Sequence, residues 1–319
     1  MIATEREEKK NYSIQAITGC LGKKKIITGI DSILADNDTS DIYIPPSFAR
    51  KILLHLAKNY HKSFSSAAEL ILAITGPFGV GKSVMVVEVC RRLGIKIFRL
   101  SVTELSSEWE GQPAKTVAQR YYQASQAQSE EGVPCCLIID DVDLAIGNFS
   151  EFSSGTKNTQ HLINVIMEIA DNPTQVCGHE TTRVPVIVTA NDLSKVYGAV
   201  TRPRRMRAWA YQPTSKETFE TGCRIIGDVL TDDQLEMLEE ISVGWKPVHF
   251  SQLKSILQEM VLEVQCNFAH AKNYIYAAFC KHPSIDKHGS LQITDDILLA
   301  AIEEVESGRK AAQTSYVEC

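Results

Sequence analysis

The string GPFGVGKS at residues 76–83 constrains the fold more than any other feature of this 319-residue chain. It matches the pattern G-x-x-x-x-G-K-[ST] and stands between an apolar run at 70–75 and a helical pattern at 83–93. A strand that turns through glycines into a helix directs backbone N–H groups and the positive end of the helix dipole at one place. The sequence therefore predicts a phosphate-binding loop, with a chance glycine-rich turn as the alternative. Its expected nucleotide-binding residues are Gly76, Pro77, Phe78, Gly79, Val80, Gly81, Lys82 and Ser83.

A second motif supplies the acidic groups that such a loop needs. Lys82 is expected to bind the terminal phosphates of ATP, and Ser83 is expected to bind Mg²⁺. The apolar run LIIDDVD at 137–143 ends in carboxylates. Of these, Asp140 is expected to hold Mg²⁺ together with Ser83, and Asp141 to orient the attacking water. A solvent-facing acidic strand end is the alternative for this run.

Polar and basic residues follow two later apolar segments. The strand signal at 184–189 leads into Ala-Asn-Asp, which makes Asn191 a candidate for hydrogen bonding the γ-phosphate or the water, with a simple turn as the alternative. The string RPRRMR at 202–207 can supply an arginine that neutralises transition-state charge in a neighbouring subunit. A solvated basic turn is the alternative, above all for Arg204 and Arg207.

The order of strand and helix signals divides the chain. Strands and helices alternate up to about residue 212, which predicts an α/β domain with a mostly parallel sheet covered on both faces. After Pro213 the periodicity is helical, with almost no strand signal. We therefore expect a weakly ordered N-terminal segment at 1–41, an α/β nucleotide-binding domain at 42–212, an α-helical domain at 213–285 and a C-terminal tail at 286–319.

Composition excludes several other classes. The 33 lysines and arginines against 39 aspartates and glutamates give a formal net charge of −6, so no nucleic-acid surface is expected. No window approaches the roughly 18 apolar residues of a membrane span, so no membrane contact is expected. The first residues carry no apolar signal region, which favours the cytoplasm or a processed organellar form. The nine cysteines include no C-x-x-C pair, and we interpret them as reduced thiols.

The motifs, taken in order, resemble the AAA+ ATPase module. Within that class, five strings resemble the Rubisco activases, and the similarity runs from about residue 42 to about residue 264. They are IPPSFARKILLHLAKNY (44–60), EGQPAKTVAQRYYQA (110–124), CCLIIDDVD (135–143), MEIADNPTQV (167–176) and RVPVIVTANDLSKVY (183–197).

This resemblance implies a fold, ligands and site residues. It implies an α/β AAA+ module with a parallel sheet flanked by helices, followed by a smaller α-helical lid domain. It further implies ATP and Mg²⁺ as ligands and self-association into a ring, expected to be hexameric. Asn191 takes the place of sensor 1, and Arg202 and Arg205 take the place of trans-acting arginines. Lys254 stands where a sensor 2 arginine is expected, as a point charge instead of a planar fork.

The string ELSSEWEGQPAK at 104–115 resembles the pore loop of protein-threading AAA+ rings, in which an aromatic residue grips the substrate chain. Trp109 stands between Glu108 and Glu110, and a buried tryptophan is seldom bracketed by unpaired carboxylates. We therefore favour a substrate-pore position over a core position for Trp109. The loop 147–159, rich in Gly, Ser and Asn, is expected to be a second pore loop.

The resemblance implies an ATP-dependent protein remodeller of the Rubisco activase type, which uses ATP hydrolysis to release inhibitory sugar phosphates from Rubisco. One alternative is a remodeller of another protein complex. Another is a nucleotide-gated scaffold with little turnover, which Asp141 and Lys254 leave open. The expected location is the cytoplasm of a bacterial or cyanobacterial-like cell, or the plastid stroma for a processed form.

Overall fold

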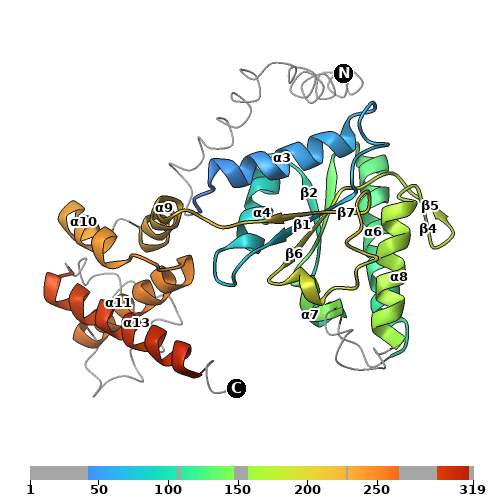
Figure 1. Cartoon of the computed structure of the whole chain (residues 1–319). Helices are drawn as coiled ribbons and strands as arrows, with labels where there is room; N and C mark the ends of the chain where they lie inside the picture. The colour runs from blue at the N-terminus through green and yellow to red at the C-terminus, as the bar shows by residue number, and fades with distance from the viewer. Residues whose placement is uncertain (1–41, 106–108, 147–156, 228, 266–292, 316–319) are drawn as a thin grey trace, which may run out of the picture. The chain divides into compact units, whose positions relative to one another are not determined.

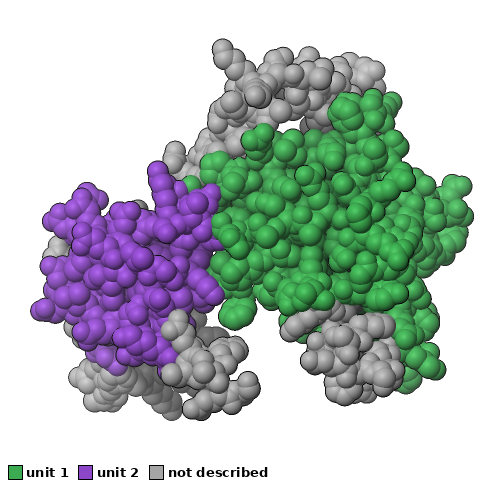
Figure 2. Space-filling model, in the orientation of Figure 1, with its two compact units in different colours: residues 1–212 green, residues 213–319 purple. Residues whose placement is uncertain are grey.

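The computed structural model describes residues 42–105, 109–146, 157–227, 229–265 and 293–315 (Figure 1). Its contacts divide the chain into two compact units, residues 1–212 and residues 213–319, which Figure 2 colours separately. The expected N-terminal segment 1–41 lies outside the described residues. Within the described residues, no helix is long and apolar enough to cross a membrane.

The first unit is built on a five-stranded sheet with strand order β2-β3-β6-β1-β7, in which all neighbours run parallel. This confirms the expected α/β fold. The strands are β1 (Ile71–Thr75), β2 (Lys96–Leu100), β3 (Cys135–Ile139), β6 (Val186–Ala190) and β7 (Met206–Ala210). Every residue of β3 and β6 is buried, because helices cover a parallel sheet on both faces.

Alternating residues of β1 show how the two faces are covered. Leu72 and Ile74 pack with the apolar sides of two helices on one face, and Ile71 and Ala73 pack with two helices on the other (Figure 1). This is the two-residue repeat of a strand that is buried on both sides. The covering helices are α3 (Pro46–Tyr60) and α4 (Lys82–Arg92) on the first face and α6 (Gln112–Glu131) and α8 (Lys157–Asp171) on the second.

Short elements complete the first unit. They are α5 (Val102–Leu105), α7 (Val142–Ile146), the 3-10 helix η3 (Leu193–Lys195) and a small antiparallel pair, β4 (Gln175–Val176) with β5 (His179–Glu180). Three of them, α5, α7 and η3, follow closely after β2, β3 and β6. They therefore lie at the carboxyl edge of the sheet, where open α/β folds bind ligands.

The second unit is helical in its described residues. Its helices are α9 (Ser215–Ile226), α10 (Asp232–Ile241), α11 (Pro247–Gln265) and α13 (Asp295–Ser315). Thr214 and Thr231 begin α9 and α10 with reciprocal capping boxes, which explains why these helices start where they do. A side chain at Gly222 would approach the ring of Phe250 to 2.4 Å, so glycine is required where α9 meets α11.

The boundary expected at residue 285 is wrong. Helix α13 lies in the region that we expected to be a tail, yet Leu298, Ala301, Ile302 and Val305 belong to the core of the second unit. Their spacing is that of one apolar helix face, so the helical domain continues through α13. Of the expected tail, 286–292 and 316–319 lie outside the described residues.

Candidate functional site

The predicted phosphate loop connects β1 to α4 and depends on glycine. Gly76 has φ of +149°, and a Cβ atom there would lie 2.3 Å from the carbonyl oxygen of Tyr211, just beyond β7. Gly79 and Gly81 also have positive φ, at 78° and 82°. Gly81 caps α4 without a side-chain hydrogen bond, so the positive end of the helix faces the loop. This backbone can approach a phosphate closely.

Lys82 is the first residue of α4, and its ammonium group reaches back to the loop. Its side chain is buried, and Nζ donates hydrogen bonds to the carbonyl oxygens of Gly76 at 2.7 Å and Pro77 at 2.9 Å. Nζ also donates to Oδ1 of Asn191 at 3.0 Å. The structure thus brings together the loop lysine and the strand-end amide that the sequence singled out. Their roles toward nucleotide stay predictions.

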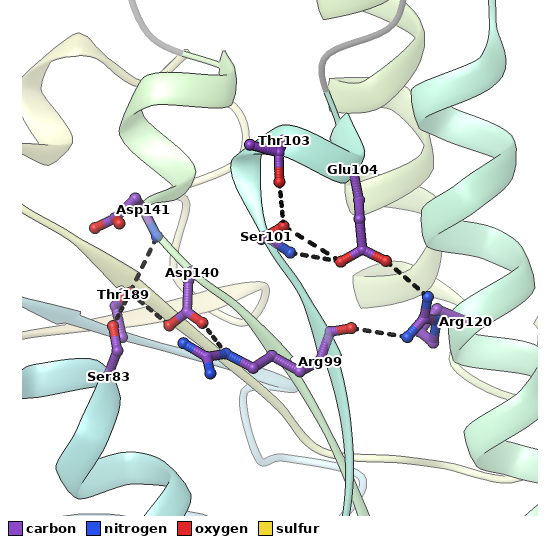
Figure 3. Close-up of polar contacts among 9 residues, drawn as sticks. All are labelled: Ser83, Arg99, Ser101, Thr103, Glu104, Arg120, Asp140, Asp141 and Thr189. Carbon is purple, nitrogen blue, oxygen red and sulfur yellow. Dashed lines mark hydrogen bonds and ion pairs between the residues drawn. The ribbon is translucent and has the colours of Figure 1, made fainter. Parts of the chain in front are cut away.

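Thr189 on β6 joins the two residues that we expect to bind Mg²⁺. Its hydroxyl donates to Oδ1 of Asp140 at 3.2 Å and lies 3.2 Å from Oγ of Ser83 (Figure 3). It also accepts the backbone N–H of Asp141 at 3.0 Å. Because a carboxylate only accepts, the assignment that satisfies all three contacts has Ser83 donating to Thr189. Sequence reasoning missed Thr189, although it is a polar residue in an apolar strand, two positions before Asn191.

Arg99 on β2 forms an ion pair with Asp140, from its Nε to Oδ2 (Figure 3). The carbonyl oxygen of Arg99 accepts a hydrogen bond from Arg120 at 2.9 Å, and Arg120 also donates to Glu104 at 2.9 Å. Sequence reasoning missed Arg99 as well. The feature that could have indicated it is a basic residue one position before the end of β2, the strand next to β3, after which the carboxylates follow.

Asp141 lies in a local environment that disfavours its charge. Burial raises the pKa of its carboxyl group above the ordinary value, and the negative charges of Asp140 and Asp143 raise it further. Lys82 and Arg99 act in the opposite direction and do not cancel the rise. Its backbone φ is +49°, which is uncommon for a residue other than glycine. A carboxylate with a raised pKa accepts a proton more readily at neutral pH.

The chemistry of these donors fits Mg²⁺. Among the described residues, no group of three or more His, Cys, Asp and Glu side chains could hold a metal ion by itself. Mg²⁺ is commonly held by one or two protein oxygens, with phosphate oxygens and water completing its octahedron. Ser83 and Asp140, which share Thr189 as a hydrogen-bond partner, are suited to such a partial site.

The two predicted trans-acting arginines differ in their surroundings. Arg205 pairs with Asp171 at the end of α8, with Nε to Oδ1 at 2.7 Å and Nη2 to Oδ2 at 2.5 Å, and also donates to the carbonyl of Ala199. Arg202 is exposed. In the second unit, Nζ of Lys254 on α11 donates to the carbonyl oxygen of Ile225 at 2.7 Å. The roles of all three side chains stay predictions.

Trp109 is 80% exposed, so the core alternative for this residue is excluded. The residues after it are tied to the beginning of α8. The N–H of Gly111 donates to Oδ1 of Asn158 at 2.7 Å, and Glu110 lies 3.6 Å from Nζ of Lys157. Of the second predicted pore loop, residues 147–156 lie outside the described part of the chain, and the remaining three begin α8.

Comparison with known proteins finds a family that matches part of the chain. Residues 72–213 match the family described as ATPase family associated with various cellular activities (AAA). The chain is 37% identical over 219 residues to ribulose bisphosphate carboxylase/oxygenase activase 1 of Nicotiana tabacum, an alignment that covers 66% of this chain and 49% of that protein. It is 34% identical over 238 residues to activase 1 of Larrea tridentata, covering 72% and 50% of the two chains.

The activase of Arabidopsis thaliana is 35% identical over 235 residues, covering 71% of this chain and 49% of that protein. All three relatives are named as chloroplastic. The chain spans about half the length of the curated relatives that it matches. These matches confirm the resemblance that the five strings carried.

Proposed function

We propose, from the premise that residues 72–213 of this chain are an AAA domain, that the protein is an ATPase that remodels other proteins. The observation that carries the proposal is the convergence of Lys82, Ser83, Asp140 and Asn191 at the carboxyl edge of the sheet. Lys82 and Ser83 begin α4 after β1, and Asp140 and Asn191 follow β3 and β6, so the three preceding strands are neighbours in the sheet. The buried hydroxyl of Thr189 connects Ser83 with Asp140. Phosphoryl transfer depends mainly on such positioning and charge stabilisation.

Each residue has a distinct task in this proposal. Lys82 exchanges its carbonyl partners in the loop for the terminal phosphates of ATP, while the loop N–H groups bind the phosphate oxygens. Ser83 and Asp140 hold Mg²⁺, which when bound neutralises charge on the phosphates. Asp141, with its raised pKa, orients the attacking water and accepts its proton. Asn191 bonds the water or the γ-phosphate.

A neighbouring subunit completes the site in the assembled ring. Arg202 is exposed and extends a guanidinium group that can stabilise transition-state charge in an adjacent copy. Arg205 is proposed to act in the same way, or to brace the turn that carries Arg202 through its ion pair with Asp171. We propose a hexameric ring, in which Lys254 of the helical domain serves as sensor 2.

The proposed target is Rubisco, from which ATP-driven remodelling releases inhibitory sugar phosphates. The support is sequence identity of 34% to 37% to proteins named Rubisco activases. Trp109 is proposed to grip the target chain, since a side chain that is 80% exposed contributes little to its own fold. We propose the plastid stroma as its location because these relatives are named chloroplastic, and they offer no support for a bacterial cytoplasm.

Two assays on the purified full chain test this function. Steady-state phosphate release from ATP with and without Mg²⁺ measures the ATPase, and recovery of carboxylation by sugar-phosphate-inhibited Rubisco measures the remodelling. Mg²⁺-dependent turnover with reactivation is the expected result. Turnover without reactivation would point to another target protein. ATP binding without turnover would overturn the ATPase and favour a nucleotide-gated scaffold.

A further inference from the structure

Asp143 is a buried carboxylate that the proposed reaction does not use. It lies in the first turn of α7, three residues after Asp140, and is 7% exposed. Its Oδ2 accepts two consecutive backbone N–H groups, from Asn191 at 2.9 Å and from Asp192 at 3.0 Å. Its Oδ1 is buried and has no hydrogen-bond partner among the described residues.

Burial of this carboxylate is energetically expensive. A buried charge loses its hydration, and here only one of the two oxygens is compensated by N–H groups within the described residues. Asp140 and Asp141 add negative charge nearby, and Asp143 is one of the groups that disfavour ionisation of Asp141. A leucine or alanine in this place would avoid both costs. The two N–H groups therefore indicate what the carboxylate is needed for.

Those N–H groups belong to a backbone segment that the sheet does not hold. Strand β6 pairs with both neighbours but ends at Ala190, so the N–H of Asn191 lies beyond the ladder. Thr189 and Asn191 are two positions apart, so their side chains point to the same face of the extended chain. Thr189 contacts Asp140 and Ser83, and Asn191 contacts Lys82. The side chain of Asn191 can stay in place only if its backbone is fixed.

We propose that Asp143 is the positioning residue of Asn191, holding its backbone so that the side-chain amide stays beside Lys82 and the terminal phosphate. The inference rests on the proposed ATPase function and deepens it. Asp143 binds no substrate itself, and its effect on turnover passes through Asn191. The carboxylate joins the ends of β3 and β6, which are adjacent in the sheet.

The first test is a set of single variants assayed for kcat, KM and melting temperature. Asp143→Ala removes the acceptor, and we expect kcat to fall about 10- to 100-fold with little change in KM, because a small misplacement costs rate more than binding. Asp143→Asn keeps a carbonyl acceptor in the same place and should recover most of the rate. Asp192→Ala is the matched control, since this carboxylate caps η3 in the same turn through the N–H of Ser194. It should leave kcat near that of the wild type.

The decisive test is a double-mutant cycle with Asn191→Ala. If Asp143 acts through Asn191, the double variant should turn over no more slowly than Asn191→Ala alone. Losses that multiply would overturn the proposal, as would a wild-type kcat for Asp143→Ala. Should Asp143→Ala fail to fold, the cycle uses Asp143→Glu, which keeps the charge and moves the acceptor by one methylene. A wild-type rate for that variant would also overturn it.

The outcome for the ATPase itself is separable. If the wild type hydrolyses ATP and the losses of the two single variants multiply, this inference is overturned and the proposed function stands. If the wild type binds nucleotide without turnover, the proposed function fails. In that case the same double-mutant cycle is measured on the ratio of ATP to ADP affinity. Coupling between Asp143 and Asn191 in that ratio supports the positioning role, and its absence overturns it. A wild type that binds no nucleotide would defeat both.

Discussion

Lys82 and Asn191 lie 109 residues apart in the sequence and meet through a hydrogen bond of 3.0 Å between Nζ and Oδ1. The ammonium group has two further acceptors in the loop itself, the carbonyl oxygens of Gly76 and Pro77. It is therefore held in place before any phosphate arrives. On binding, the phosphate oxygens replace acceptors that are already arranged around the charge, which limits the entropy lost by the long side chain.

Lys82→Ala should abolish nucleotide binding or turnover, because it removes the cation that the loop directs at the terminal phosphates. Nucleotide affinity and ATPase rate measure the effect. Lys96→Ala is the control, since Lys96 is paired with Glu131 at 2.5 Å on the edge strand β2. We expect no loss of binding for the control. A Lys82 variant with both properties near wild type would show that the loop does not bind ATP.

Asp141→Asn should preserve ATP binding and slow hydrolysis by about 100- to 10,000-fold, the range that a positioned base contributes. Asp140→Asn should instead raise the Mg²⁺ concentration needed for half-maximal rate, since it weakens a metal ligand. The two variants are compared in one Mg²⁺ titration. Normal hydrolysis by Asp141→Asn, with an inactive Asp140→Asn, would assign both tasks to Asp140.

Arg202→Ala should lower turnover without lowering the melting temperature, because Arg202 is exposed. Arg205→Ala should lower both, with a stability loss of about 1 kcal/mol or less from its partly exposed ion pair. Asp171→Ala breaks the same ion pair and keeps the arginine, so it should affect melting more than turnover.

Mixed rings test whether these arginines act in trans. Arg202→Ala subunits have an intact phosphate loop, and Lys82→Ala subunits have intact arginines. Mixing the two impaired variants should restore part of the ATPase rate, since some sites regain both parts. No recovery at any mixing ratio would mean that Arg202 serves only its own chain.

Trp109→Ala should leave the melting temperature and basal ATPase nearly unchanged and abolish remodelling of the target. Its side chain is 80% exposed and thus stabilises little of its own unit. Trp245→Ala is the matched control: that ring is 4% exposed in the core of the second unit. Its removal should cost roughly 3 to 5 kcal/mol. Wild-type remodelling by Trp109→Ala would remove the case for threading through this loop.

His55 makes stability depend on pH. Burial lowers its pKa from 6.5 to about 4, with Lys58 and Arg183 acting in the same direction and Glu69 and the carbonyl of Val186 against it. The unfolded chain therefore gains a proton at a higher pH than the folded chain does. Stability is complete above pH 6.5 and falls as the pH drops toward 4, by up to roughly 3 kcal/mol.

His55→Gln should flatten this dependence, because glutamine carries no titrating group and can still donate to Val186. Denaturant melts at a series of pH values measure it. The exposed His179 provides the control, and His179→Gln should retain the wild-type slope. An unchanged slope in His55→Gln would contradict the assignment.

Local backbone patterns were predictable from the sequence, and pairings between distant segments were not. The string around Lys82 implies its own strand, turn and helix, so the loop could be identified without a structure. Arg99 could not be assigned, because its contact with Asp140 depends on β2 and β3 lying side by side. Nor could the partner of Arg205, since Asp171 ends a separate helix.

The C-terminal helix was missed for a related reason. The apolar spacing of α13 is visible in the sequence, but a polar stretch separates it from the preceding helical pattern. Only its packing against Trp245 and Phe250 identifies it as part of the core. Propensity describes a segment, whereas membership of a core is a property of the fold.

The exposure of Trp109 also provides an optical signal. The chain has three tryptophans, of which Trp245 is shielded and Trp209 half-buried beside Lys51. Acrylamide should therefore quench the fluorescence of Trp109 first, and its emission should lie furthest to the red. A polypeptide that covers the indole would block quenching and shift that emission to the blue. Binding of a target chain could then be followed in real time on the unlabelled protein.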